Sequence, residues 1–442
     1  MMDQYDAIVI GGGILGCFMA RSLRQWNISV LLLEQEEDVC TGITRANSAI
    51  VYPGYDNKPG TRKAELTVRS NREFDALCEM LDVPFSRCGS LLVTYEPDTV
   101  PRLERKMENG LRNGVPGLRL LTGSEAEAME PMLHKGVVAA LYAPTTGTVN
   151  PWQLGIAAYE NALRNGAASR MDTRVTGIRT EDGGYVVDTT RGQYRCRAVV
   201  NCAGLEADRV QELLCPPRVR LELDGAEYLV LDPDSPKPDK VIFHQSRSCG
   251  KGITAIPCTE GNLLLSGVRK ELGVPFATTV EGIEELKTMA LELLPGLETL
   301  SVIRSFGAVR PNPRTDDGDS IPDFCIENPV PGFYSFIGIK TPGLTCAHQL
   351  SLEVAGELAV YLNAETNPGF DPHRKGIPQS GNEIVCRCGQ ITSDQIREAI
   401  SRGATTVDGV KRRIGTGMGP CQGSRCSWEI EKMLEDAKHG NL

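Results

Sequence analysis

Apolar and polar positions follow a regular order near the start of the chain. The apolar run DAIVI (6–10) predicts a buried strand, GGGILG (11–16) predicts a glycine turn, and the residues that follow have the spacing of an amphipathic helix. A second apolar run, SVLLL, predicts a strand that ends at Glu34. A strand, a glycine turn, a helix and a second strand together form the βαβ unit that binds dinucleotides.

Three glycines of this turn have separate predicted tasks. Gly11 permits the tight turn, Gly13 lets the backbone approach a pyrophosphate, and Gly16 lets the helix pack closely on the strand. The pyrophosphate would lie at the helix N-terminus, where free N–H groups and the helix dipole favour anions. Glu34 is placed to accept a ribose hydroxyl. NAD and FAD share this unit, and we find no second GxGxxG that would indicate a separate NAD site.

Four cysteines form a second pattern further along the chain. Cys386 and Cys388 stand in CRC, and Cys421 and Cys426 stand in CQGSRC. Two short loops with this spacing can converge on a [2Fe-2S] cluster. The stretch between the pairs predicts two short helices, with Ser393 as the cap of the first and Gly403 at its end.

Two other readings of these cysteines remain open. Four thiolates can hold structural zinc, and four cysteines can simply be buried thiols. Zinc ribbons usually carry CxxC pairs, whereas CxC followed by CxxxxC is closer to the ferredoxin-like pattern. The segment 383–437 resembles the bacterioferritin-associated-ferredoxin-like [2Fe-2S] domain, and the resemblance implies that the four cysteines are the cluster ligands.

Composition and charge narrow the class of protein. The chain has 442 residues, of which 41% are hydrophobic and 24% charged, as in ordinary globular proteins. A formal net charge of −10 argues against general affinity for nucleic acid. The N-terminal stretch lacks the basic region of a signal peptide, and no apolar run is long enough to predict a membrane span. Fifteen cysteines without a disulfide-like rhythm favour a reducing cytoplasm.

Four stretches resemble the D-amino-acid-oxidase-like superfamily of FAD-dependent oxidoreductases, in the branch of glycerol-3-phosphate and L-2-hydroxyglutarate dehydrogenases. They are 40–66, VVNCAGLEAD (199–208), 304–323 and 332–359. The resemblance implies FAD as the cofactor and an α/β fold with a discontinuous Rossmann-like FAD domain, an α+β substrate domain and a small helical [2Fe-2S] module. Beyond Gly11, Gly13, Gly16 and Glu34, the flavin contacts that it implies are Arg45, Asn47, Ser48, Val175, Gly204, Gly338 and Gly343.

The expected domain boundaries follow from this resemblance and from the pattern of the chain. Residues 1–363 form the oxidoreductase, with FAD-binding parts at about 1–80, 150–215 and 326–363. The substrate domain is expected at about 84–149 and 216–325, where alternating strands such as AEYLVL and an amphipathic helix near residues 280–294 are predicted. Residues 364–382, rich in proline, glycine and polar side chains, predict a linker to the [2Fe-2S] domain at 383–437.

Oxidation of an acidic alcohol needs a cation for the acid, a base for the hydroxyl proton and a hydride acceptor. Arg310 is the candidate anion clamp because a guanidinium pairs with carboxylate or phosphate bidentately. Lys340 is predicted beside it, where it polarises the substrate or binds phosphate, unless it is a solvated lysine at a strand end.

The candidate base departs from the superfamily pattern. Related dehydrogenases read IVHAGYD where this chain reads IVYPGYD, so Tyr52 stands in place of a histidine. Tyrosine can relay a proton, but its ordinary pKa near 10 makes it a poorer base at neutral pH. His348 and His244 are further histidines that could reach the pocket, although a histidine without a visible partner is more often structural.

The sequence therefore predicts a cytoplasmic FAD- and [2Fe-2S]-dependent dehydrogenase of a small acidic alcohol, with sn-glycerol 3-phosphate as the preferred substrate. Electrons would leave through the cluster to a partner such as a second flavoprotein subunit. The alternatives are an L-2-hydroxy acid, amino acid or imino acid dehydrogenase, a non-catalytic electron-transfer subunit, and an oxidase with zinc in the cysteine module.

Overall fold

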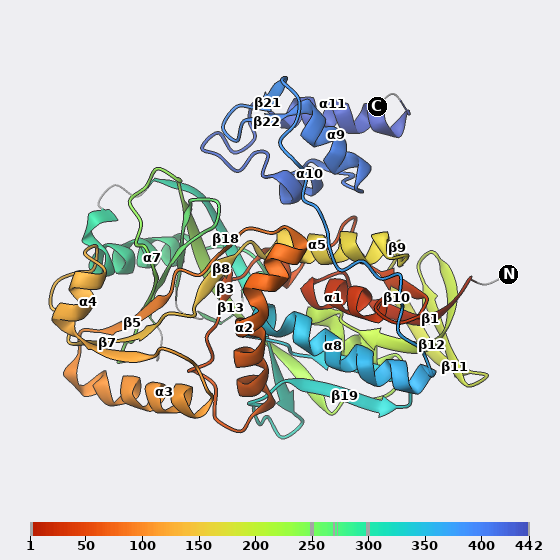
Figure 1. Cartoon of the computed structure of the whole chain (residues 1–442), viewed down its shortest axis with the longest axis horizontal. Coiled ribbons are helices and arrows are strands. Elements are labelled where there is room, and N and C mark those ends of the chain that lie inside the picture. The colour runs from red at the N-terminus through yellow and green to blue at the C-terminus, as the bar shows by residue number, and fades with distance from the viewer. Residues whose placement is uncertain (1–2, 248–251, 268–269, 272, 298–300, 441–442) are drawn as a thin grey trace.

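The computed structural model describes residues 3–247, 252–267, 270–271, 273–297 and 301–440, and within them the chain builds two large sheets (Figure 1). In the first sheet, β9, β2, β1 and β12 pair in parallel and β20 joins β12 in parallel, whereas the pairs β11-β12, β10-β11 and β19-β20 are antiparallel. Its order is β10-β11-β12-β1-β2-β9, and β20 and then β19 continue from β12. The bounds are β1 (Asp3–Ile10), β2 (Val30–Leu33), β9 (Ala168–Arg170), β10 (Val175–Glu181), β11 (Gly184–Thr189), β12 (Gly192–Asn201), β19 (Cys325–Val330) and β20 (Phe333–Ile337).

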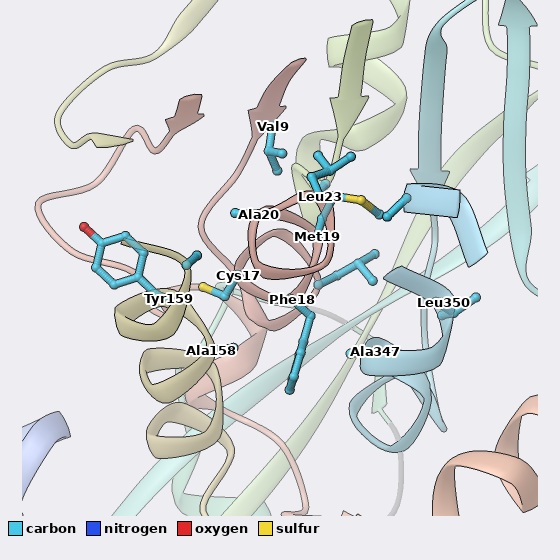
Figure 2. Close-up of a cluster of buried hydrophobic side chains, with 14 of the residues drawn as sticks. Val9, Cys17, Phe18, Met19, Ala20, Leu23, Ala158, Tyr159, Ala347 and Leu350 are labelled. Carbon is cyan, nitrogen blue, oxygen red and sulfur yellow. The ribbon is translucent and has the colours of Figure 1, made fainter. Parts of the chain in front are cut away.

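Helix α1 (Ile14–Leu23) follows β1 through the glycine turn and is buried on nearly every side. It contacts α5 (Pro151–Arg164) and α8 (Gly343–Leu362), and Figure 2 shows Phe18 between these two helices. The amphipathic pattern predicted for this segment is therefore wrong, because the second face is covered by protein and not by water. Even Arg21 is 1% exposed, and its guanidinium donates to the side chain of Asn161 at 3.0 Å.

The second sheet is mixed and contains nine strands among the described residues. Strands β13 and β18 pair antiparallel along almost their whole length, which sets Arg310 opposite Asp224. Helices α3 (Val100–Arg112), α4 (Gly123–Met129) and α7 (Val280–Leu293) pack on this sheet. The strands are β5 (Ser90–Thr94), β6 (Arg119–Thr122), β7 (Ala139–Ala143), β13 (Val219–Leu231), β14 (Val241–His244), β15 (Thr254–Pro257), β16 (Leu263–Ser266), β17 (Lys270–Glu271) and β18 (Val302–Thr315).

The two sheets draw their strands from alternating stretches of the chain. The first sheet takes strands from the beginning, the middle and the stretch after β18, whereas the second takes them from the two stretches in between. This alternation supports the proposed division into a discontinuous first domain and an inserted second domain. A small sheet of β3 (Ile50–Val51), β4 (Phe85–Ser86) and β8 (Gly147–Val149), helix α2 (Arg62–Leu81) and helix α6 (Ala207–Glu212) complete this part of the fold.

The C-terminal module is a short hairpin and three helices with their own apolar core. Its elements are β21 (Ile384–Cys386), β22 (Ile391–Thr392), α9 (Ser393–Ser401), α10 (Val407–Ile414) and α11 (Ser427–Lys438). Helices α9 and α10 lie between the two cysteine pairs, as the sequence predicts. The prediction that Ser393 caps α9 is wrong by one residue, because Thr392 and Gln395 form a capping box and Ser393 is the first helical residue.

The segment 364–382 runs along the first domain before it enters the module. The side-chain amide of Asn161 donates to the carbonyls of Asp371 and His373, both at 3.0 Å. Arg374 pairs with Glu160 at 2.8 Å, and both of these side chains are largely buried. The predicted linker is therefore fastened to α5 at several points. Among the described residues, no helix has the length and apolar character needed to cross a bilayer.

Packing of α8 against α1 gives a testable pH dependence of stability. Burial, together with the charge of Arg21, lowers the pKa of His348 to about 3 from an ordinary value of 6.5. The unfolded chain therefore takes up a proton at a higher pH than the folded chain does, and stability decreases as the pH falls from 6.5 towards 3. At about pH 5 the lowered pKa of His348 reduces the free energy of unfolding by about 2 kcal/mol relative to neutral pH.

We expect His348→Leu to remove this part of the pH dependence, measured by urea unfolding near pH 7 and near pH 5. His373→Leu is the control, because that histidine is exposed in the segment 364–382. If the free energy of unfolding of His348→Leu differed between pH 7 and pH 5 by as much as that of the wild type, the assignment would be contradicted.

Candidate active site

A cavity of about 1710 Å³ is lined by residues from both sheets and from the C-terminal module. One part of its wall is the glycine turn before α1 and the loop after β2. Another part is formed by β18, by the stretch 339–344 that leads into α8, and by one face of α3. The size and the strand-end position of the cavity suit a dinucleotide together with a small substrate.

At Gly11 and Gly16 the glycine turn leaves no room for a side chain. A Cβ atom on Gly11 would lie 2.6 Å from the carbonyl oxygen of Cys202, and one on Gly16 would lie 1.8 Å from the carbonyl oxygen of Gly11. Gly11 has a φ of +99°, which other residues rarely adopt. The turn thus presents bare backbone to the cavity, as a dinucleotide pyrophosphate requires. Gly11 and Gly13 line the cavity, whereas Gly16 serves the packing of α1 on β1.

Glu34 closes this end of the cavity. Its carboxylate accepts the Gly12 N–H at 2.6 Å and the Glu36 N–H at 2.9 Å, and it lines the cavity at the end of β2. Burial raises the pKa of Glu34, while the same backbone N–H groups oppose that rise. A buried carboxylate fixed in this way is oriented to accept a hydroxyl hydrogen bond from a ribose. The glycine turn and Glu34 together fit the binding of FAD.

The other predicted flavin contacts divide into two groups. Most of them line the cavity, and Gly338 instead packs at its margin, where a Cβ would meet Pro313 at 2.6 Å. The side chain of Asn47 holds its own turn, since it donates to the Thr44 carbonyl and accepts from the Ala49 N–H. The predicted contacts found in the cavity wall are Arg45, Asn47, Ser48, Val175, Gly204 and Gly343.

Basic side chains gather where β18 meets the stretch before α8. Arg310 and Lys340 both line the cavity there, and the ammonium of Lys340 donates to the side-chain oxygen of Asn312 at 3.4 Å. Asn312 is two residues beyond Arg310 on β18, so their side chains share one face of the strand. The structure therefore brings the two predicted cations together.

Lys63 is a third cation in this wall, and the sequence reasoning missed it. Its side chain lies against the ring of Phe324, its residue is 7% exposed, and it lines the cavity. Burial lowers the pKa of Lys63, and the neighbouring charge of Arg310 lowers it further, while Asp323 opposes both. A buried lysine beside an arginine creates a strongly positive region that suits an anion. Its position in the sequence, in the first turn of α2, gave no signal of this contact.

Tyr52 lines the cavity with its ring stacked on Phe243 at a centroid distance of 6.3 Å. Its backbone is fixed on both sides, because its N–H donates to the Thr345 hydroxyl and its carbonyl accepts from Asn71. Tyr55 also lines the cavity but is 1% exposed, and burial raises the pKa of its phenol well above the ordinary value. Of these two phenols, Tyr52 is better placed to relay a proton.

The structure places the two candidate histidines outside the cavity wall. His348 packs against Phe18 in the core between α1 and α8, with ring centroids 5.3 Å apart. His244 packs against Tyr95, although its neighbours Phe243 and Gln245 line the cavity. Strand alternation explains this, since successive side chains of β14 point to opposite faces. The expectation that either histidine could reach the pocket is therefore wrong. None of the five histidines, all of which the structure describes, lines the cavity.

The four cysteines of the C-terminal module line one small cavity, together with Arg387, Pro420 and Arg425. The Cys388 thiol lies 3.6 Å from the sulfur of Cys421. The Gly423 N–H is the main cause of a lowered pKa at Cys421, which favours the thiolate form that binds iron. Within the described residues, no three His, Cys, Asp or Glu side chains are grouped as ligands of a single metal ion. A [2Fe-2S] cluster takes two thiolates on each of its two irons, so four thiols that line one cavity fit it without three of them meeting at one metal ion.

Comparisons with known proteins identify both cofactor-binding parts of the chain. The FAD dependent oxidoreductase family matches residues 6–356, and the BFD-like [2Fe-2S] binding domain matches residues 384–436. A glycerol 3-phosphate dehydrogenase of Caloramator mitchellensis is 36% identical over 98% of this chain and 94% of its own length. The mitochondrial L-2-hydroxyglutarate dehydrogenase of Homo sapiens is 34% identical over 52% of this chain and 53% of its own length.

A solved structure shows the same fold. Reduced L-alpha-glycerophosphate oxidase from Mycoplasma pneumoniae, with FAD bound, has a TM-score of 0.78 and 22% identity to this chain. The match covers 85% of this chain and 99% of the oxidase.

Proposed function

Because this chain belongs to the family of FAD-dependent oxidoreductases and carries a BFD-like [2Fe-2S] binding domain, we propose that it oxidises sn-glycerol 3-phosphate and passes the electrons through the cluster. FAD and [2Fe-2S] as cofactors, predicted from the sequence, are confirmed by these two family matches. The substrate and the route of the electrons are the proposal. The full-length similarity to a glycerol 3-phosphate dehydrogenase supports it.

The observation that carries the choice of substrate is the group of three cations, Lys63, Arg310 and Lys340, in one wall of the cavity. A phosphate monoester brings nearly two negative charges to one end of a small molecule. One guanidinium would suffice for a single carboxylate, whereas three cations suit the higher charge density of phosphate. We assign the phosphate of the substrate to this group.

The chain's own residues would then perform the following steps. Arg310 holds the phosphate in a fork, Lys63 and Lys340 complete its charge balance, and the bound end fixes the carbinol carbon in the cavity. Tyr52 passes the hydroxyl proton on to water in the cavity as that carbon loses a hydride and becomes a ketone. FAD, when bound, would supply the hydride acceptor for this carbon, and a [2Fe-2S] cluster held by the four cysteines would supply one-electron transfer. A second flavoprotein or another electron-acceptor protein is the proposed partner.

A direct test follows the flavin absorbance without oxygen. The protein, loaded with FAD and iron, is mixed with glycerol 3-phosphate, with L-2-hydroxyglutarate or with glycerol. We expect rapid bleaching by glycerol 3-phosphate and none by glycerol, which lacks the anionic group. Bleaching by 2-hydroxyglutarate alone would replace the proposed substrate with the second candidate, which the similarity to the human enzyme favours. Absence of bleaching by all three would contradict oxidation of either acid.

A further inference from the structure

Helix α10 is the element through which the C-terminal module meets the first domain. It comprises Val407–Ile414, between the cap residues Thr406 and Gly415, and it contacts α5 (Figure 1). A Cβ atom on Gly409 would lie 3.1 Å from a carboxylate oxygen of Asp38, so the helix approaches the loop after β2 closely. That loop also forms part of the wall of the FAD cavity, through residues such as Glu36 and Thr41.

Buried ion pairs fix α10 in this position. Arg413 binds both carboxylate oxygens of Asp38, at 2.7 and 3.0 Å, and Arg412 binds one of them at 3.2 Å. The side chains of Asp38 and Arg413 are 3% and 1% exposed. Burial alone would raise the pKa of Asp38, but the two guanidiniums outweigh it and hold that pKa below its ordinary value. Removing one member of such a buried ion pair would leave an uncompensated buried charge. The ion pairs therefore stabilise the docked position of α10.

Arg412 differs from Arg413 because it also lines the FAD cavity. Its side chain is 9% exposed, and its Nε has no hydrogen-bond partner within the described part of the chain. Asp408, one turn earlier on α10, lines the same cavity. The module therefore contributes a buried, partly unpartnered guanidinium to the wall of a site that binds a dinucleotide.

The ion pairs at this contact join more arginines than carboxylates. Four arginines, 374, 402, 412 and 413, are bound to three carboxylates, those of Asp38, Glu160 and Glu398. Arg402 pairs with both Glu160 and Glu398. Arg412 and Arg413 both pair with Asp38. FAD carries negative charge on its pyrophosphate, so an anionic group in the cavity would give Arg412 a partner in addition to the Asp38 carboxylate that it shares with Arg413 and to Asp408 one turn away.

We propose that the [2Fe-2S] module completes the FAD site, with Arg412 donating a charge-assisted hydrogen bond to the bound dinucleotide and Asp38 positioning that arginine. FAD binding and docking of the module then stabilise each other, because each orders the helix that the other uses. The cluster-bearing module is thereby held against the flavin cavity. This inference rests on FAD as the cofactor and is independent of the choice of substrate.

The test measures FAD affinity and not turnover. FAD is removed from the full-length protein with its iron retained, and rebinding is followed by quenching of flavin fluorescence. We expect Arg412→Gln to weaken FAD binding about tenfold, and Arg412→Lys to recover part of the loss because it keeps the charge. The matched control is Arg397→Gln, since Arg397 lies in the same module but pairs with Asp394 at the surface. Iron content reports that the module is folded in every variant.

Hydrogen exchange provides the second measurement. FAD is expected to slow amide exchange of residues 407–414 in the wild-type protein and in Arg397→Gln, and to have little effect in Arg412→Gln. Asp38→Asn is expected to weaken FAD binding in the same direction, because it releases the helix. The proposal would be overturned by equal FAD affinities in Arg412→Gln and Arg397→Gln. It would also be overturned if FAD left the amide exchange rates of α10 unchanged in the wild-type protein.

Discussion

Replacing Arg310 with glutamine is expected to lower kcat/KM for glycerol 3-phosphate by about a thousandfold, because the buried phosphate loses its charged, two-pronged partner. Removal of one member of a desolvated charge pair typically costs about 2–5 kcal/mol, which spans this factor. Arg310→Lys keeps the charge but loses the fork, so it is expected to recover only part of the rate. Lys63→Gln should raise KM more than it lowers kcat, since it completes the charge balance of the bound end.

Arg314→Gln is the matched control for this experiment. Arg314 lies four residues beyond Arg310 on β18, but it pairs with Glu222 and is absent from the cavity wall. We expect its kcat/KM to stay within about twofold of the wild type, since exposed ion pairs contribute little. FAD content, measured as the ratio of flavin absorbance to protein absorbance, must be equal in all variants. A loss in Arg314→Gln as large as that in Arg310→Gln would show that damage to the sheet, and not loss of the clamp, explains the rate.

Replacing Cys388 with serine is expected to remove the iron–sulfur cluster and to reduce electron delivery to a one-electron acceptor by about a hundredfold or more, because the cluster loses a thiolate ligand. Cys388 is exposed, whereas Cys386 and Cys426 belong to the apolar core of the module, so serine at 388 spares the packing. Reduction of the flavin by substrate should persist at nearly its original rate. The measurements are iron content, the visible spectrum, and the rates of flavin bleaching and of acceptor reduction.

Cys215→Ser serves as the comparison, since Cys215 is a partly exposed thiol at the end of α6 and belongs to neither cavity wall. It should keep its iron and both rates. If Cys388→Ser lost its iron but reduced the acceptor as fast as the wild type, the electrons would leave the flavin directly, and the proposed route through the cluster would be wrong. Retention of iron with an unchanged spectrum would instead remove Cys388 from the ligand set.

Local sequence patterns predicted the two cofactor-binding units well. The glycine turn with Glu34 depends on backbone rules that act within one βαβ unit, and the cysteine spacing depends on two short loops. Where the sequence failed to predict the burial of α1 and the contact of Lys63, the cause was a contact between distant segments. His348 and His244 face away from the cavity because of the helix and strand on which they lie, and α1 is covered on both sides by helices that arrive much later in the chain.

The sequence by itself predicted the chemistry of this protein: a dinucleotide turn, an arginine and a lysine as the candidate ligands of an anion, and four thiols as the candidate ligands of iron. Each of these is set by residue type and short-range spacing. The tertiary structure alone decided that Lys63 joins Arg310 and Lys340, and that Arg412 reaches the FAD cavity from another domain. Such contacts depend on how α2 and α10 pack against the rest of the fold. Burial and charge balance between distant segments produce no periodic pattern in the sequence, so the sequence does not predict them.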